Sequence, residues 1–199
     1  MTEMKFFVYG SLCEGLVHFN KIKEFVLESA QASLRAQAYR LKVGYPVVLE
    51  AGEQKIDGQF LRLKGSEILL ALLDSFHGEL SKMGKVGLHY RAEKTILLQD
   101  GQEESAWVYF LNPQQLPPSA LCLEDGDWRK SLSEKPPMTQ FLSEKQRNYI
   151  LRLGASSGRE IVPIDLGLYR ELMNLELIVD KGRRLALSKL GNEVYRFLT

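Results

Sequence analysis

The first residues of the chain show a pattern of apolar and polar positions that predicts a buried strand followed by a turn. Phe6, Phe7 and Val8 form a short apolar run, which is typical of a strand that is buried on both faces. The segment Tyr9-Gly10-Ser11-Leu12 interrupts this run, because glycine allows a turn that a residue with a Cβ resists. Apolar residues then recur at helical intervals, so the pattern predicts a helix over residues 21–37.

Shorter segments predict further strands of a sheet. Residues 39–43 alternate between apolar and polar with the period of a half-buried strand, and two further strands are predicted at residues 47–49 and 56–63. The residues at positions 51–55 are mostly polar and predict a loop between the last two of these strands.

A helix is predicted over residues 66–77. Ser66 is suited to cap its first turn, and leucines at helical spacing give it one apolar face. Gly78 is well placed to end the helix in the left-handed conformation. A loop that contains glycine and lysine residues, at positions 79–87, follows the helix.

The next two segments predict a β-hairpin. Residues 89–98 and 105–111 have strand-like patterns, and Asp100-Gly101 between them is a turn signal. The first ~110 residues therefore alternate strands with helices. This order predicts an α+β domain around a mixed or mostly antiparallel sheet.

The rest of the chain changes character after residue 112. Prolines interrupt residues 113–140 and little periodicity is present, which predicts a linker or an arm that wraps the first domain. Residues 141–199 predict a helix after Ser143, a helix after Asp165, a β-hairpin and a terminal helix. The sequence thus predicts a first domain at residues 1–112, a linker and a winged-helix-like unit.

The composition of the chain argues against several classes of binding partner. Lys plus Arg is 26 and Asp plus Glu is 25, so no global electrostatic argument favours a nucleic acid or a membrane. The two cysteines, Cys13 and Cys122, are too few for a disulfide framework and are not spaced as a metal site. We therefore expect a cytoplasmic protein without a metal or cofactor. Residues 1–5 run directly into the first strand, so we expect no signal peptide.

The opening strand and turn also carry a chemical prediction. A strand that ends in a glycine turn leaves backbone N–H groups unpaired, and such groups form a cradle for an anion. The alternative is a tight connection with no ligand, because strands often end in a Gly-Ser turn. Cys13 follows the turn, and a buried cysteine that packs as a small apolar side chain is favoured there over a nucleophile. His18 and His89 lack the spacing of metal ligands.

Several dispersed motifs together resemble the gamma-glutamylcyclotransferase-like family over residues ~5–130. They occur in the family's order and with similar spacing, and they are Phe7-Val8-Tyr9-Gly10-Ser11-Leu12, Gly44-Tyr45-Pro46, Gly58 before Leu61, Leu72-Leu73-Asp74-Ser75-Phe76, Tyr90-Arg91 and Ala106-Trp107-Val108-Tyr109. The resemblance implies a mixed sheet that is partly closed like a barrel, with a pocket at its mouth.

The resemblance also implies a reaction. Family members cleave a gamma-glutamyl amide without water, because the α-amine of the substrate attacks its own γ-carbonyl. The products are 5-oxoproline and a released amine or peptide. In this family the loop equivalent to Tyr9-Gly10-Ser11-Leu12 holds the α-carboxylate through backbone N–H groups, and Tyr90 would point toward the pocket.

The family's proton acceptor is a glutamate immediately before the glycine that ends the helix, and here that position is His77. Three interpretations stay open. His77 carries the proton, since imidazole titrates near neutrality; Glu79 supplies a carboxylate from a shifted loop; or the chemistry is lost and the pocket only binds. The last interpretation gives the alternative hypothesis of a non-catalytic metabolite sensor, whose C-terminal unit docks a protein or DNA partner.

The C-terminal unit has its own candidate contacts. Lys181, Arg183 and Arg184 lie on the predicted wing, where they could reach phosphates. The presumptive recognition helix carries two glutamates and a single arginine, which is unfavourable for a DNA groove. We therefore favour docking to a protein or to a second copy of the chain over DNA. Residues 146–169 also faintly resemble the helical tail of some long bacterial family members.

Overall fold

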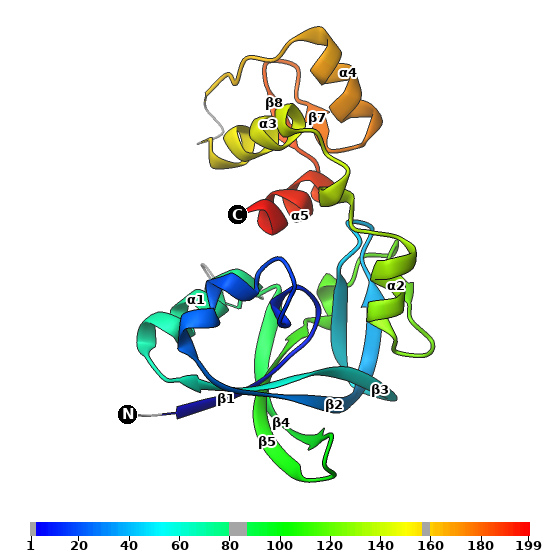
Figure 1. The fold of residues 1–199 in the computed structure, drawn as a ribbon. Helices are drawn as coiled ribbons and strands as arrows, with labels where there is room; N and C mark the ends of the chain where they lie inside the picture. Colours follow the sequence, from blue (N-terminus) through cyan, green and yellow to red (C-terminus); the bar gives the residue numbers. More distant parts are fainter. Residues whose placement is uncertain (1–2, 80–86, 157–159) are drawn as a thin grey trace. The chain divides into compact units, whose positions relative to one another are not determined.

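A computed structural model describes the chain except for residues 1–2, 80–86 and 157–159, and it divides the chain into two compact units (Figure 1). The first unit consists of Met1–Leu41 and Tyr45–Lys135, and the second of Lys42–Gly44 and Pro136–Thr199. Each unit is described by itself below.

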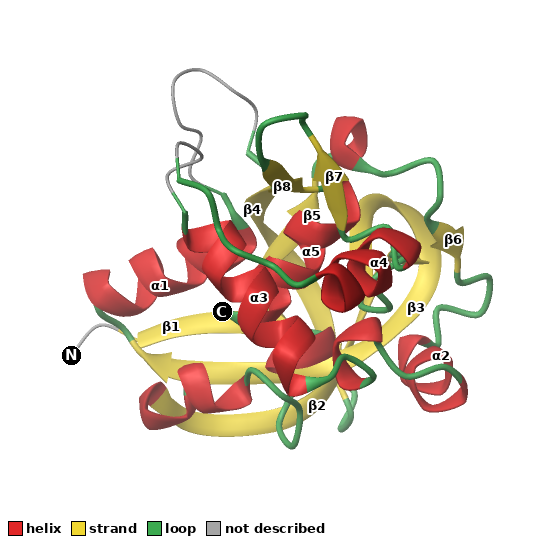
Figure 2. Ribbon diagram, turned by 90° about the horizontal axis from the view of Figure 1, so that it is seen from above, coloured by secondary structure: helices red, strands yellow, loops and turns green. Residues whose placement is uncertain are grey.

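The first unit is built around one strongly curved sheet (Figure 2). Its strands are β1 (Glu3–Val8), β2 (Val26–Arg40), β3 (Pro46–Lys64), β4 (His89–Leu98), β5 (Glu103–Leu111) and β6 (Leu121–Cys122). Their order is β3-β1-β5-β4-β2-β6, and an additional pairing of β2 with β3 closes the sheet on itself. β1 runs parallel to β5, while the other pairs are antiparallel. The predicted α+β class with a mixed, barrel-like sheet is confirmed.

The predicted helix over residues 21–37 is wrong. Two short 3-10 turns, Phe19–Lys21 and Lys23–Phe25, lead directly into the long strand β2, which pairs with β3 along nearly its whole length. The predicted polar loop at 51–55 lies within β3, although residues 50–53 have no partner in the register between β2 and β3. Sheet pairing here overrides the local preference of the sequence.

The helix predicted after Ser66 is confirmed as α1 (Glu67–His77). The Ser66 side chain accepts a hydrogen bond from the backbone N–H of Leu69, at 3.0 Å. Gly78 ends the helix with φ +64°, in the left-handed conformation that glycine adopts without strain. Most of the loop predicted at 79–87 lies outside the described residues. The predicted hairpin is confirmed as β4 and β5, with Gly101 in the turn at φ +86°.

Residues 113–135 belong to the first unit. They form a 3-10 turn at Pro113–Gln115, the short strand β6 and the helix α2 (Trp128–Glu134). Trp128 is 2% exposed, and its indole N–H donates to the backbone carbonyl of Asp57 at 2.6 Å. This buried anchor ties the proline-rich segment to β3.

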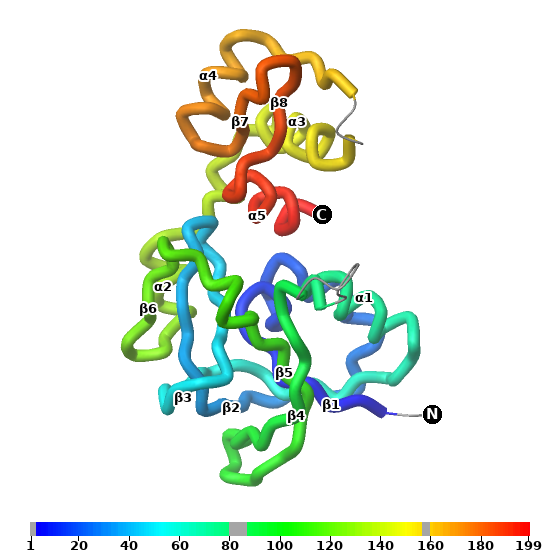
Figure 3. The backbone as a smooth tube through the Cα atoms, turned by 180° about the vertical axis from the view of Figure 1, so that it is seen from behind, coloured from blue at the N-terminus to red at the C-terminus, as the bar shows by residue number. Residues whose placement is uncertain are grey.

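The second unit contains the predicted order of two helices, a hairpin and a terminal helix (Figure 3). A 3-10 turn at Met138–Gln140 precedes α3 (Glu144–Ala155), α4 (Leu166–Asn174), β7 (Ile178–Asp180), β8 (Leu185–Leu187) and α5 (Lys189–Leu198). Ser143 and Gln146 form the predicted capping box of α3. The likeness to a winged helix stays a prediction. No helix among the described residues is long and apolar enough to cross a membrane.

Gly58 in β3 provides a test of how tightly the sheet is packed beside β1. A Cβ at this position would lie 2.4 Å from the Val8 carbonyl oxygen and 2.5 Å from the Phe7 ring. We expect Gly58→Ala to lower the free energy of unfolding by about 3 kcal/mol, because backbone and a buried ring must move. The control Gly101→Ala has open space but a positive φ, and should cost about 1 kcal/mol. Urea unfolding followed by tryptophan fluorescence reports on the first unit, and equal effects of the two variants would contradict the prediction.

Asp165 gives the second unit a predicted dependence on pH. The carboxylate forms a 2.7 Å ion pair with Lys145 and accepts the Leu168 N–H at 2.9 Å, and these contacts lower the pKa of Asp165. A lowered pKa contributes stability that is fully present above the unfolded value, about 3.9, and is lost as pH falls through the folded value.

Asp165→Asn keeps a capping side chain but cannot ionise. From pH 6 down to pH 3, the wild type should therefore lose more amide-exchange protection in α4 than the variant does. The measurement is peptide-resolved exchange, corrected for the intrinsic effect of pH. The same acid-induced loss in both proteins would show that this carboxylate does not matter.

Candidate active site

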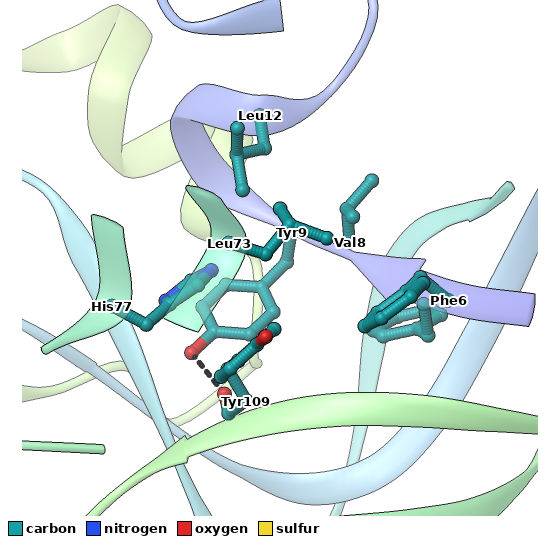
Figure 4. Close-up of a pocket in the computed structure, with 8 residues that line it drawn as sticks. Phe6, Val8, Tyr9, Leu12, Leu73, His77 and Tyr109 are labelled. Atoms are coloured by element: carbon teal, nitrogen blue, oxygen red, sulfur yellow. Dashed lines mark hydrogen bonds between the residues drawn. The ribbon is translucent and has the colours of Figure 1, made fainter. Parts of the chain in front are cut away.

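A pocket lies where β1 and the loop after it meet β5 and the end of α1 (Figure 4). Apolar and aromatic side chains dominate its lining, which consists of Phe6, Phe7, Val8, Tyr9, Leu12, Leu73, His77 and Tyr109. Its volume is about 260 Å³ with the open mouth included.

The loop after β1 is a single 3-10 turn at Gly10–Leu12. Gly10 has φ +64°, and a Cβ there would lie 3.0 Å from the Pro46 ring, so glycine is favoured by both its backbone and its neighbour. The Leu12 N–H faces the Tyr9 carbonyl in the first turn of this 3-10 helix, whereas the structure shows no hydrogen bond for the Ser11 N–H within the described part of the chain. The predicted anion cradle therefore has one N–H donor, that of Ser11, on the turn that contributes Leu12 to the pocket.

Hydrogen bonds on both sides hold this loop in place. The Glu14 N–H donates to the Gln59 side chain at 2.7 Å, and the His18 N–H donates to the Ser11 carbonyl at 2.9 Å. Cys13 is fully buried, and burial raises the pKa of its thiol to about 12. A thiol that stays protonated is a poor nucleophile. Cys13 thus packs as the small apolar side chain that the sequence favoured.

His77 is the last residue of α1 and lies in the pocket wall. Its imidazole stacks on the Tyr109 ring, with ring centroids 4.0 Å apart and planes 10° apart. The Phe6 ring is also nearly parallel to Tyr109, at 6.1 Å. Figure 4 shows His77 and Phe6 on either side of the two tyrosines. The structure therefore brings His77 and the Tyr9-to-Leu12 loop into one pocket.

The Tyr9 phenol connects the loop to the sheet. Its hydroxyl donates to the Tyr109 carbonyl at 3.0 Å and accepts from the Val48 N–H at 3.3 Å. Burial raises the pKa of Tyr9 well above the ordinary value for tyrosine. The phenol is therefore neutral at physiological pH and acts as a fixed hydrogen-bonding link.

A buried polar cluster lies behind the stacked rings. The Tyr109 hydroxyl donates to Asp74 at 2.5 Å, and the Arg91 guanidinium donates to both Asp74, at 2.5 Å, and the Tyr109 hydroxyl, at 3.3 Å. Burial and the hydrogen bond to Asp74 raise the pKa of Tyr109. Asp74 lies one helical turn before His77 on α1, so the cluster ties the end of this helix to β4 and β5.

The structure does not place Tyr90 in this pocket. Tyr90 pairs with Phe110 across β4 and β5, whereas Arg91 pairs with Tyr109. Because successive side chains of a strand point to opposite faces, Tyr90 lies on the other face of the sheet from Arg91. Its hydroxyl donates to Glu50 at 2.6 Å.

The second proton-carrier candidate, Glu79, lies just beyond the helix end. It is half-buried, its N–H donates to the Asp74 carbonyl at 2.9 Å, and it is not among the residues that line the pocket. His89 contacts His77 instead, because its Nδ1–H donates to the His77 carbonyl at 2.6 Å.

Two predictions from the sequence remain, the phosphate contacts of the second unit and the lack of a metal site. Lys181, Arg183 and Arg184 are exposed at the turn between β7 and β8, and their role as phosphate contacts stays a prediction. Where the structure describes the chain, no group of three or more His, Cys, Asp or Glu side chains could hold a metal ion.

Sequence reasoning missed Tyr109 and Asp74 as residues of the site. Both lie in motifs that resemble the family, yet neither motif indicates which side chain faces α1. The available signal was the register of the predicted hairpin, which places Tyr109 opposite Arg91.

Comparison with known proteins agrees with this fold. A family model described as gamma-glutamyl cyclotransferase, AIG2-like, matches residues 6–130. A solution structure of an Arabidopsis thaliana protein aligns with a TM-score of 0.50 and 18% identity, covering 83% of this chain and 94% of that one. An AIG2-like protein from mouse aligns with a TM-score of 0.46 and 17% identity, covering 59% of this chain and 82% of that one. Comparison with curated proteins finds no match.

The two hydrogen bonds of the Tyr9 hydroxyl lead to a prediction. Tyr9→Phe keeps the ring but leaves the buried Val48 N–H without this acceptor, so the free energy of unfolding should fall by about 1–3 kcal/mol. Urea unfolding followed by tryptophan fluorescence measures this loss. Tyr39→Phe, a similar change in a β2 residue for which the structure shows no hydroxyl hydrogen bond, is the control. Equal stability of the two variants would contradict the role given to the Tyr9 hydroxyl.

Proposed function

The chain belongs to the gamma-glutamyl cyclotransferase, AIG2-like family, and we propose that it cyclises a small gamma-glutamyl amine or peptide to 5-oxoproline, with His77 as the proton carrier. One observation carries this proposal. The imidazole of His77 and the loop that would hold the substrate's carboxylate line the same small pocket.

The loop supplies the proposed contact with the α-carboxylate. The Ser11 N–H is a donor from which an anion can accept a hydrogen bond, and the oriented dipoles of a tight turn favour negative charge. The lining residues include no lysine or arginine, so the backbone carries this contact without a side-chain cation. With its carboxylate bound at this loop, the substrate would fold so that its α-amine and γ-carbonyl lie toward His77.

The proposed reaction needs only one proton carrier. The neutral imidazole accepts a proton from the α-ammonium, and the free amine attacks the γ-carbonyl carbon. A new C–N bond closes the five-membered ring, and the imidazolium gives its proton to the leaving nitrogen as the C–N bond to that nitrogen breaks. The ring nitrogen then loses its extra proton through the same imidazole to the released amine, so that the products are the neutral lactam and an ammonium ion. Because attack is intramolecular, the main task of the pocket is to hold the substrate in its folded conformation.

Histidine in place of a carboxylate has a consequence for binding. A neutral imidazole does not attract the α-ammonium as a carboxylate would. The aromatic faces of the lining offer partial compensation, since a cation close to a tyrosine ring is attracted by about 0.5–2 kcal/mol. We therefore propose a substrate that is bound weakly through its ammonium group and mainly through its carboxylate.

The geometry favours His77 over Glu79. The His77 ring lies in the pocket wall, whereas the Glu79 backbone is tied to the Asp74 carbonyl and its side chain is not part of the lining. The assignment of the proton carrier can therefore be tested by comparing two variants that are only two residues apart.

The test is the formation of 5-oxoproline from a panel of gamma-glutamyl amines and short gamma-glutamyl peptides, measured by mass spectrometry. For any substrate that the wild type converts, His77→Ala should lower kcat by about 10²–10⁴-fold, the usual contribution of a general acid–base. Glu79→Ala is the matched control and should keep nearly full activity.

Two results would contradict the proposal. Activity that survives in His77→Ala but is lost in Glu79→Ala would move the proton carrier to Glu79. A wild type that converts no substrate, although panel members raise its melting temperature, would exclude the reaction and favour the metabolite sensor.

A further inference from the structure

We propose that Tyr109, held by Asp74 and Arg91, is a positioning residue that fixes the orientation of the His77 imidazole in the pocket. This inference rests on the proposed function of His77 as the proton carrier.

The first argument is the geometry of the stack. The rings of His77 and Tyr109 are 4.0 Å apart and 10° from parallel, so a whole face of the imidazole is covered. His77 is the last residue of α1, where a helix has lost the support of a following turn. The His89 ring holds the His77 carbonyl through a 2.6 Å hydrogen bond. Tyr109 supports the side chain of His77, as His89 supports its backbone carbonyl.

The second argument is the anchoring of Tyr109 itself. Its side chain comes from a residue that is 3% exposed, and its hydroxyl both donates to Asp74 and accepts from Arg91. Asp74 and Arg91 are also paired with each other, at 2.5 Å. A phenol with both hydrogen bonds satisfied cannot turn without breaking a buried ionic cluster. The ring that supports His77 is therefore fixed at its far end.

The third argument is the balance of charge close to His77. Asp74 and Arg91 compensate each other, so removal of one leaves the other beside the stacked rings. Among the described residues, the other titratable groups that contact His77 or line the pocket are Tyr9 from the loop after β1 and His89 from β4, and Glu79 follows His77 by two residues. Neither Asp74→Asn nor Arg91→Gln alters these groups directly, so the two variants isolate the charge of the pair.

The experiment has a readout that does not depend on turnover. The chain has three histidines, so NMR titration of ring-labelled histidine resolves His77, which is assigned by its loss in His77→Gln. Asp74→Asn should lower the pKa of the His77 imidazole and Arg91→Gln should raise it, each by about half a unit, because an uncompensated cation disfavours the imidazolium and an uncompensated anion favours it.

The same spectra test the stack directly. A ring proton of His77 that lies over Tyr109 should show a ring-current shift that persists in Tyr109→Phe and disappears in Tyr109→Leu. In kinetics, Tyr109→Phe should lower kcat by about 10-fold with little change in KM, because a loosened ring misplaces the proton carrier rather than the substrate.

Glu50→Gln is the matched control for these variants. It alters another hydrogen bond between a phenol and a carboxylate, formed with Tyr90 of β4. This variant should change neither the His77 titration nor kcat. Because Asp74→Asn could unfold the protein, Arg91→Lys provides a second test. This substitution keeps the charge and should restore the His77 titration that Arg91→Gln alters.

Two outcomes would overturn the inference. The first is a His77 titration and ring-current shift that are unchanged in folded Tyr109→Leu and Arg91→Gln. The second is a pKa that moves in the same direction in Asp74→Asn and Arg91→Gln. Failure of the proposed function looks different, because it would be a lack of 5-oxoproline while the NMR effects are present.

Discussion

The hydrogen bond between the Tyr109 hydroxyl and Asp74 is the interaction on which the pocket depends. It joins α1 to the face of β5 that the helix covers, and Arg91 of β4 completes the link. One wall of the pocket, Leu73 and His77, comes from α1, while the opposite wall comes from β1 and β5. Without a fixed distance between helix and sheet these walls would not define one space.

Such a buried ionic cluster contributes more to geometry than to stability. Removing a charged pair from water has an energetic cost that often cancels most of its attraction, whereas leaving one partner alone is strongly unfavourable. The ionic cluster therefore favours one position of α1 relative to the sheet. Leu69 and Leu73 are both buried, and their apolar packing supplies the attraction that holds α1 on the sheet.

Local signals in the sequence were sufficient for several elements and insufficient for the longest strands. Ser66, Gly78 and the Asp100-Gly101 turn act within a few residues, and each forms the predicted structure. The prediction for the β2 segment is wrong because its alanines favour a helix when only the local sequence is considered. In the folded unit Ala36 and Ala38 are fully buried in a strand paired with β3, and this pairing is a property of the closed sheet.

The candidate site shows the same division between local and long-range information. Sequence motifs located the Tyr9-to-Leu12 loop and His77, because both follow an element that local signals define. Tyr90, which the family resemblance indicated, does not line this pocket, whereas its neighbour Arg91 belongs to the cluster with Asp74 and Tyr109. A shift of one position moves a side chain to the opposite face, and only the covering helix determines which face matters. Tyr109, on the correct face, could be recognised only once α1 was placed over it.

The aromatic surroundings of His77 also bear on why a histidine is compatible with this position. A planar imidazole gains dispersion and electrostatic contact from the stacked Tyr109 ring and from the edge of Phe76, whose centroid lies 5.1 Å away. A glutamate at the same position would face these rings with a charged group that they cannot solvate. The pocket wall is therefore better matched to a neutral ring than to an acid.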